Sequence, residues 1–188
     1  VPNVDGSNAK ILKRFNHKKH FNKVRNLSIK QINNSLWGSH DSNILTLCNE
    51  NIFLWDLQHR SDVPILKNQN LGIHNFDASY QHGIIAIAGE FGLALNDLRI
   101  SNTQSSVFQP AKGFEMGANS IKWAPYDSNV LAASHFDGSV RLWDIRAQNY
   151  FGKLTGHNDL VTSLEWSEES SSDLYSGSKD GNIIHWDL

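Results

Sequence analysis

The chain has 188 residues, a formal net charge of −2 and one cysteine, Cys48. Its content of 39% hydrophobic and 19% charged residues is typical of a soluble globular protein and not of a disordered one. A single thiol excludes an intrachain disulfide framework and fits a reducing compartment. No apolar run approaches the roughly 18 residues of a membrane-spanning helix, and the first residues contain no apolar core of a secretion signal. We therefore expect an intracellular protein of the cytoplasm or the nucleus.

Residues 1–30 form a basic arm. Eight Lys and Arg residues stand here against Asp5 alone, which gives the arm a charge of +7 and leaves −9 for the rest of the chain. Phosphates of a nucleic acid or of an anionic membrane surface could bind the arm without sequence readout. The candidate residues are Lys13, Arg14, Lys18, Lys19, Lys23 and Arg25. A solvated linker is the favoured interpretation of the arm, and His17 and His20 without a third ligand do not predict a metal site.

Four copies of one pattern follow the arm. Each is an apolar stretch that ends in an aromatic residue and Asp, or in a worn version of that pair, and the four Asp residues are Asp56, Asp97, Asp144 and Asp187. Their spacings of 41, 47 and 43 residues indicate one supersecondary unit repeated along the chain. The predicted units are approximately 31–68, 69–110, 111–155 and 156–188.

Unit one keeps the spacing of a later unit. Trp37 precedes Asp41 by the same interval by which Trp123 precedes Asp127 in unit three. Segment 63–66 is a candidate outer strand, because its proline lacks a backbone donor and suits the edge of a sheet.

Unit two is the most worn. Segment 84–88 is a clear strand and segment 106–108 is a candidate outer strand. However, Glu90 stands at the turn position that Asp occupies in the later units, and Asn96 replaces the Trp.

Units three and four are the best formed. In unit four, segments 160–166 and 174–178 read as strands, the first with the alternation of a half-buried strand. Lys179-Asp180-Gly181 then makes a tight turn into a strand that ends at Trp186, and Asp-Gly between two such segments is a strong hairpin signal. Unit three repeats this order and adds 150–154 as a candidate outer strand.

With its candidate outer strand, each unit predicts a four-stranded antiparallel sheet. No segment carries the sustained 3.6-residue period of a helix. The fold class is therefore all-β. Three tryptophans, Trp37, Trp123 and Trp166, end the first strand of their units, and we expect them to pack between neighbouring sheets.

The Gly156-His157 pair, the Asp180-Gly181 turn and the closing Trp186-Asp187 resemble the WD40 repeat. The resemblance covers roughly residues 28–188 and implies a β-propeller of about four blades around a central channel. It also implies a buried polar network in each well-formed blade, since a buried indole N–H and a buried carboxylate both need partners. The network residues would be His157, Ser176 or Ser178, Asp180 and Trp186, with a partial set of Ser134, Asp137 and Trp143 in unit three. Units one and two are expected to lack most of it.

The resemblance also bears on the size of the ring. WD40 rings usually have about seven blades, so we expect these four to be part of a larger ring. A closed ring of four blades would instead need a segment such as 10–13 as the outer strand of the last blade.

The favoured function is a non-enzymatic scaffold that binds other proteins within an intracellular complex. No nucleophile elbow, zinc-protease motif, Walker loop or cysteine pair is present, so we expect no catalytic residue, cofactor, metal or small-molecule substrate. The candidate partner-binding residues are Phe91, Phe136, Glu90, Lys179, Arg99 and Arg146. The two aromatic rings could anchor a partner at a rim or fold back onto their sheets.

An alternative function rests on two Asp-x-Arg endings, which place Arg99 and Arg146 after equivalent strands. Trp143 makes the second a Trp-Asp-x-Arg box, similar to that of WD40 substrate receptors that dock on a cullin-4 ubiquitin ligase adaptor. An Arg at such an edge could bind a carboxylate through both amino groups. The motif is short and common in WD40 repeats, so the scaffold remains the favoured function.

Overall fold

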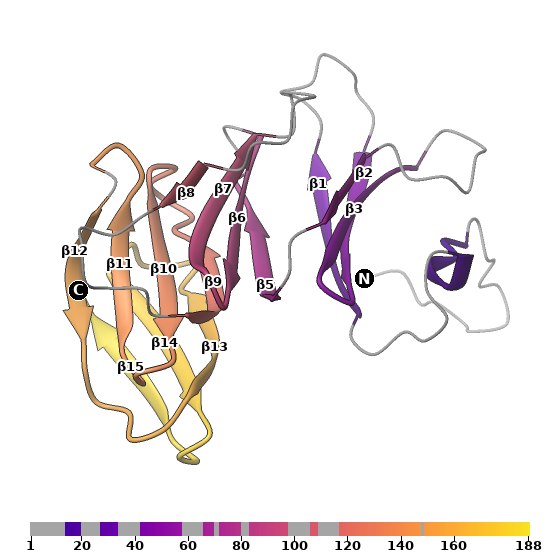
Figure 1. Ribbon diagram of the computed structural model, residues 1–188. Coiled ribbons are helices and arrows are strands. Elements are labelled where there is room, and N and C mark those ends of the chain that lie inside the picture. The colour runs from indigo at the N-terminus through magenta and orange to yellow at the C-terminus, as the bar shows by residue number, and fades with distance from the viewer. Residues whose placement is uncertain are drawn as a thin grey trace, which may run out of the picture.

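The computed structural model describes residues 14–19, 27–33, 42–57, 66–69, 72–79, 83–97, 106–108, 117–147 and 149–188. Within these ranges the chain forms fifteen strands and a single short 3₁₀ turn, η2 (His17–Lys19). The strands make four antiparallel sheets that follow one another in chain order, from the sheet of β1–β4 beside η2 to the sheet of β13–β15 (Figure 1). The predicted all-β class with four blade-like sheets is confirmed. No helix in the described ranges is long and apolar enough to cross a membrane.

We call the four sheets blades 1 to 4. Blade 1 contains β1 (Leu27–Asn33), β2 (Ser42–Cys48), β3 (Asn51–Asp56) and β4 (Leu66–Gln69). Blade 2 contains β5 (Ile73–Ala78), β6 (Ile84–Gly89), β7 (Gly92–Asp97) and β8 (Ser106–Phe108). Blade 3 contains β9 (Ala118–Trp123), β10 (Val130–His135), β11 (Val140–Asp144) and β12 (Asn149–Leu154). Blade 4 contains β13 (Val161–Trp166), β14 (Asp173–Ser178) and β15 (Ile183–Asp187).

The predicted outer strands agree with the structure to different extents. The predicted strands at 106–108 and 150–154 are present as β8 and β12. In blade 1, β4 begins at Leu66, the last residue of the predicted segment, and residues 63–65 lie outside the described ranges.

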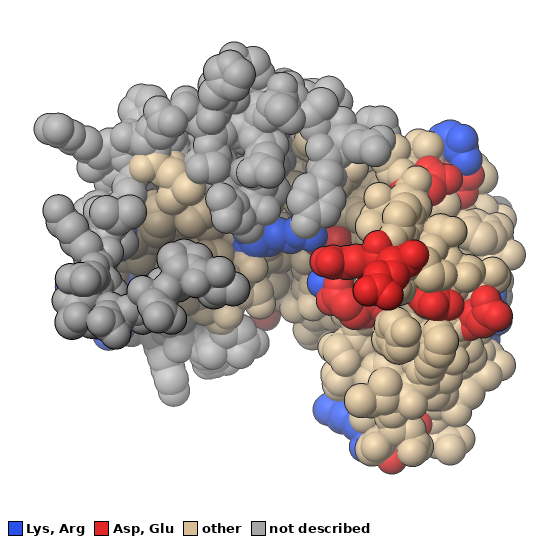
Figure 2. All heavy atoms as spheres, turned by 180° about the vertical axis from the view of Figure 1, so that it is seen from behind, with Lys and Arg blue, Asp and Glu red and all other residues tan. Residues whose placement is uncertain are grey.

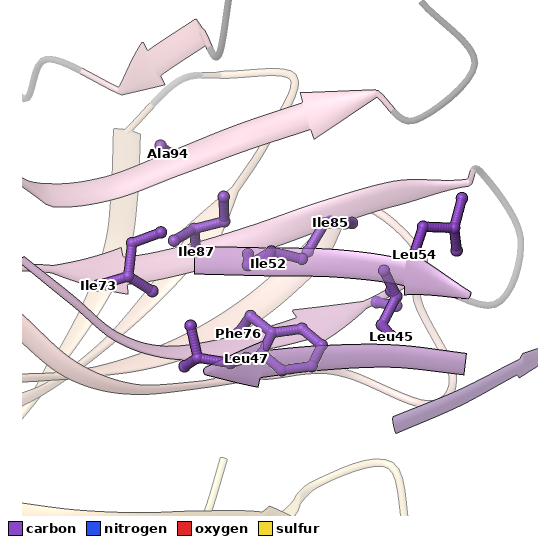
Figure 3. Packing of buried hydrophobic residues seen from close by; sticks show 10 residues of the cluster. Leu45, Leu47, Ile52, Leu54, Ile73, Phe76, Ile85, Ile87 and Ala94 are labelled. Atoms are coloured by element: carbon purple, nitrogen blue, oxygen red, sulfur yellow. The ribbon is translucent and has the colours of Figure 1, made fainter. Parts of the chain in front are cut away.

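The blades are joined through their first strands. β1 lies against β5, β5 against β9, and β9 against β13, so the first strands contact one another from blade to blade, and we call this series of blades the arc. Each junction buries its own apolar cluster. At the first junction, Leu45 and Ile52 of blade 1 pack against Phe76 and Ile85 of blade 2 (Figure 3). Full burial of each such side chain contributes about 1.5–3 kcal/mol, so the junctions hold the blades together.

Two tryptophans fasten the later junctions. Trp123 ends β9, and its indole N–H donates to the backbone oxygen of Asp77 in blade 2 at 3.3 Å. Trp166 ends β13 and donates in the same way to the backbone oxygen of Lys122 in blade 3 at 3.2 Å. Both therefore pack between blades as the sequence predicts, whereas Trp37 lies outside the described ranges.

Candidate functional site

A chain of hydrogen bonds connects three parts of blade 4. The indole N–H of Trp186 on β15 donates to the Ser176 hydroxyl on β14 at 2.7 Å. That hydroxyl lies 2.7 Å from Nε2 of His157, whose Nδ1 lies 3.1 Å from the Asp180 carboxylate in the turn. An indole N–H can only donate and a carboxylate can only accept, so the Ser176 oxygen accepts from Trp186 and the Asp180 carboxylate accepts from Nδ1–H of His157. The His157 side chain is fully buried, so this arrangement fixes the orientation of its ring between Ser176 and Asp180.

Asp180 is fixed by the backbone as well as by the histidine. The N–H groups of Asn158 and Asn182 donate to its carboxylate at 2.9 Å each, and with His157 they lower the pKa of Asp180 to about 2. Ser178 has a different role. Its hydroxyl donates to the backbone oxygen of Asp159 and accepts from the N–H of Asp180, so it shapes the turn, and Ser176 is the hydroxyl that meets the histidine.

Blade 1 contains a matching set that the sequence did not reveal. Thr46 on β2 accepts from the indole N–H of Trp55 at 2.8 Å and lies 2.8 Å from Nε2 of His17. The imidazole of His17 meets the rings of Phe53 and Trp55 edge-on, with centroids 5.6 and 5.1 Å away. The expectation that blade 1 lacks most of the network is therefore wrong. No Gly precedes His17, and it stands 29 residues before Thr46, against 19 residues between His157 and Ser176.

The position of His17 also corrects the interpretation of the basic arm. His17 is buried and Phe15 packs against the Trp55 ring, so this part of the arm docks on blade 1. Arg14, Lys18 and Lys19 around it are exposed. The other polyanion candidates, Lys13, Lys23 and Arg25, lie outside the described ranges.

Blade 3 does not bring Ser134, Asp137 and Trp143 into one network. Leu131 faces Trp143 as Leu174 faces Trp186, and this register places Ala133, not Ser134, at the position of Ser176. Ser134 accepts from the N–H of Ser120 and donates to the backbone oxygen of Val161, which links blade 3 to blade 4.

An ion pair between a buried arginine and a partly exposed aspartate takes the place of the network in blade 3. Arg141 is 1% exposed, lies 3.0 Å from the Asp137 carboxylate and stacks over the Tyr150 ring at 5.3 Å. Burial opposes ionisation of Asp137, but hydrogen bonds from Ser139 and the charges of Arg141 and Lys153 outweigh it and lower the pKa of Asp137 to about 2.

Blade 2 lacks the network, as expected. Ile87 stands at the hydroxyl position, and Asn96 occupies the Trp position opposite Ile85. Counted back from Asn96 on β7, Glu90 stands where blades 3 and 4 have Asp137 and Asp180, as the sequence alignment has it. Counted forward from Ile85 on β6, Phe91 stands there instead, because this hairpin is one residue shorter than those of blades 3 and 4.

The turns between second and third strands form a rim. Phe91 folds back onto its sheet, because it packs against the first apolar cluster and its ring lies over Gly89. Phe136 instead stays 45% exposed. Its ring covers Gly117, lying 2.5 Å from where a Cβ would stand, and meets the imidazole of His74 from blade 2 at 5.6 Å. Glu90 and Lys179 are exposed on the same rim.

Arg146 lies at the end of β11 and is already paired. Its Nε and NH2 groups donate to the two oxygens of Asp144 at 3.0 and 2.7 Å, while most of the side chain remains exposed. The hydrogen bonds from Arg146 lower the pKa of Asp144 to about 2. Arg99, its counterpart in blade 2, lies outside the described ranges.

A row of charges lines the first strands, and sequence reasoning missed it. One residue from each blade stands at the same register, and the four are Lys30, Asp77, Lys122 and Glu165. Their signs alternate along the arc. Lys30 pairs with Asp77, and Lys122 lies 2.8 Å from Glu165. Figure 2 shows basic and acidic side chains meeting in the middle of the molecule.

The environment of this row is partly buried. The Asp77 side chain is 4% exposed and also accepts from the backbone N–H of Trp123 at 2.8 Å. Burial and the charge of Lys122 lower the pKa of Lys30 to about 8. The signal in the sequence was the residue directly before Trp123 and before Trp166, whose charges are opposite.

Comparison with known proteins places the chain in a family. It is 40% identical over 190 residues to Protein DSE1 of Scheffersomyces stipitis and 40% identical over 203 residues to Protein DSE1 of Debaryomyces hansenii. These alignments cover 96% and 99% of the chain but only 28% and 30% of the two relatives' own length. A WD repeat-containing protein of Dictyostelium discoideum is 25% identical over 156 residues, which is 80% of the chain and 8% of that protein. A family model described as the DSE1 N-terminal domain matches residues 1–188, so the chain belongs to the DSE1 N-terminal domain family.

Proposed function

We propose that this domain is a non-enzymatic WD40-type scaffold that binds other proteins of an intracellular complex through the rim of its second-to-third-strand turns. The observation that carries the proposal is Phe136, an aromatic side chain that is 45% exposed on this rim and yet held in place. The WD repeat-containing relative supports the scaffold class. No cofactor, metal or small-molecule substrate is part of the proposal.

Phe136 has the features of an interface anchor. Gly117 beneath it and His74 beside it restrict the ring, so little rotamer freedom is lost when a partner covers it. Aromatic anchors of this kind carry a large share of the energy of protein interfaces. The network of Ser176, His157 and Asp180 supports the non-enzymatic part of the proposal. Its hydroxyl accepts a hydrogen bond from the Trp186 indole and its imidazole is buried, as in a structural network.

The rim can be tested by substitution in the full-length protein. Phe136→Glu should reduce the recovery of co-purifying partners by about tenfold or more, because it removes the anchor and adds a charge. Tyr126→Glu is the matched control, since Tyr126 is also exposed but lies in a turn between first and second strands. Both variants are first checked for an unchanged melting temperature. Equal recovery with the two variants would end the proposal for this rim.

A second candidate function is docking on a cullin-4 ubiquitin ligase adaptor. Arg146 supports it, because the exposed guanidinium lies at the end of the third strand. Asp144 already occupies the donor edge formed by Nε and NH2, so an adaptor carboxylate would either displace Asp144 or bind the edge that includes NH1. The double substitution Arg99→Glu and Arg146→Glu should abolish co-purification with the adaptor if docking uses these residues, and unchanged association excludes it.

A third candidate is polyanion binding by the basic arm. Arg14, Lys18 and Lys19 support it, because they are exposed around a turn that His17 anchors. The triple Ala variant of these three residues leaves His17 in place and should weaken binding to anionic vesicles or to nucleic acid. It should also make the dependence of binding on salt less steep. Wild-type affinity and salt dependence in this variant would remove the candidate.

A further inference from the structure

The face of blade 4 that points away from blade 3 is uncovered, and we call it the back face. Three residues before the Trp position, Ile52, Leu93 and Val140 of blades 1 to 3 are between 0 and 3% exposed, because the next blade covers them. Ile183 stands at this position in blade 4 and is 81% exposed. Because this position is buried in blades 1 to 3, we expect it to be buried in blade 4 as well.

Two further positions on the back face repeat the contrast. On the second strand, Leu45, Ala86 and Ala132 are fully buried, whereas Tyr175 is 38% exposed. On the third strand, His185 is exposed, and its imidazole stacks on the Tyr175 ring with a centroid distance of 4.6 Å. The back face therefore presents an aliphatic side chain and two stacked rings, the kind of surface that each other junction buries.

The first strands say which charge should meet this face. At each junction in the described ranges the register residues of neighbouring blades carry opposite charges, and Glu165 is the last of the row. Its neighbour across a further junction would be a Lys or Arg. At the two later junctions the residue after the register residue is a Trp whose indole donates to the backbone oxygen of the register residue in the preceding blade, so we expect a Trp after that cation as well. At the first junction Ala78 stands there.

We propose that the back face of blade 4 docks a further antiparallel sheet of the same polypeptide in its full-length form. This sheet presents a Lys or Arg beside Glu165, followed by a Trp. The relatives leave room for it, because the chain spans only 28% and 30% of their length. A second copy of this chain fits less well, because the cation that its β1 offers, Lys30, already pairs with Asp77 of its own chain. This docking surface is separate from the rim proposed above for partners.

Thiol labelling tests the proposal directly. Cys48 is the only cysteine of residues 1–188 and is fully buried, and peptide mass spectrometry reads the labelling of each introduced cysteine separately from any cysteine elsewhere in the full-length protein. Ile183→Cys is compared with Phe151→Cys, a control on the outer strand β12 whose side chain is 63% exposed. In the full-length protein, a maleimide should label residue 183 about tenfold more slowly than residue 151, because a docked sheet must open first. Labelling of the two positions at similar rates in the full-length protein overturns the proposal.

A second variant and a second chain length distinguish the occupant. Adding Glu165→Lys to Ile183→Cys in the full-length protein should speed labelling several-fold, because it places like charges at the junction. Glu165 also pairs with Lys122, so Lys122→Ala, which removes that pair and leaves Glu165 in place, is the matched control and should not speed labelling. No acceleration overturns the proposed charge pairing. In the chain of residues 1–188, residue 183 should label as fast as residue 151 while Cys48 stays protected. Protection of residue 183 that grows with the concentration of this short chain would instead identify a second copy and overturn the proposal.

Discussion

At the scale of single residues, blade 4 shows how one histidine connects a turn, a strand and a loop. His157 comes from the loop before β13, Ser176 from β14 and Asp180 from the turn that follows. In blade 1 the same job is done by a histidine from far upstream, His17. The hydrogen-bond partners are therefore defined by spatial position and not by a fixed distance along the chain.

The carboxylate of Asp180 makes stability depend on pH. Its pKa of about 2 lies below the ordinary 3.8, so the folded state binds the proton less tightly than the unfolded state does. The contribution is present above the ordinary pKa and is lost as the pH falls towards about 2. Urea unfolding between about pH 5 and pH 2 should show a smaller loss of stability in Asp180→Asn than in the wild type. Parallel curves for the two proteins would contradict this assignment.

The buried imidazole of His17 should matter more than its basic neighbours. His17→Ala should lower the free energy of unfolding by about 1–3 kcal/mol, because the Thr46 hydroxyl loses a partner and the Phe53 and Trp55 rings lose a contact. Lys18→Ala, at an exposed position next to it, should stay within about 0.5 kcal/mol of the wild type. Denaturant unfolding of the three proteins measures the difference, and equal stability of the two variants would argue against the docked arm.

At the scale of elements, the hairpins depend on turns that need left-handed backbone. Gly181 has φ of +84° between β14 and β15, and a Cβ there would meet no atom within 4 Å. In blade 1, Asn49 and Glu50 have φ of 47° and 67°, the pattern of a type I′ turn, although neither is glycine. A side chain at Gly181 would therefore meet no steric clash, so a substitution there measures only the cost of the left-handed backbone conformation.

Gly181→Ala should therefore lower stability by about 1–2 kcal/mol through backbone conformation alone. Gly181→Asn is the matched variant, and its cost should be smaller, because Asn tolerates the left-handed region better. Thermal unfolding of the two variants gives the comparison. An Ala variant as stable as the Asn variant would mean that the turn relaxes to another conformation.

At the scale of the whole molecule, ion pairs between first strands help to join the blades. Asp77 lies on β5, pairs with Lys30 of blade 1 and accepts from Trp123 of blade 3, so three blades meet at one carboxylate. Glu165 pairs with Lys122 in a more exposed place. The two pairs should differ in energy, because a buried carboxylate has lost its water.

Asp77→Asn should lower the free energy of unfolding by about 2–3 kcal/mol, less than for a fully buried pair because Lys30 keeps some contact with solvent. Glu165→Gln should cost at most about 1 kcal/mol, as exposed pairs do. Chemical denaturation measures both. Similar losses for the two variants would show that burial does not distinguish the pairs.

The limits of sequence reasoning follow the same scales. Period-2 patterns and Asp-Gly turns correctly predicted the all-β class and most strands, because these signals are local. The network of blade 4 was implied by the resemblance to the WD40 repeat, because His157, Ser176 and Trp186 stand at matching positions within one repeat. His17 and the row from Lys30 to Glu165 were missed, because their partners are up to 47 residues away and only the register of the folded sheets aligns them. The sequence could not decide whether the Phe91 and Phe136 rings fold back onto their sheets or stay exposed. The two residues have similar neighbours in the sequence but different neighbours in space.

The alternation of charge along the first strands distinguishes rings with an even number of blades from rings with an odd number. Signs that alternate from blade to blade can close on themselves only around an even number of blades. A ring with an odd number must contain at least one junction where two like charges, or a charge and a neutral residue, stand side by side. That junction would lack the ion pair that its neighbours have, and it is where such a ring should open first.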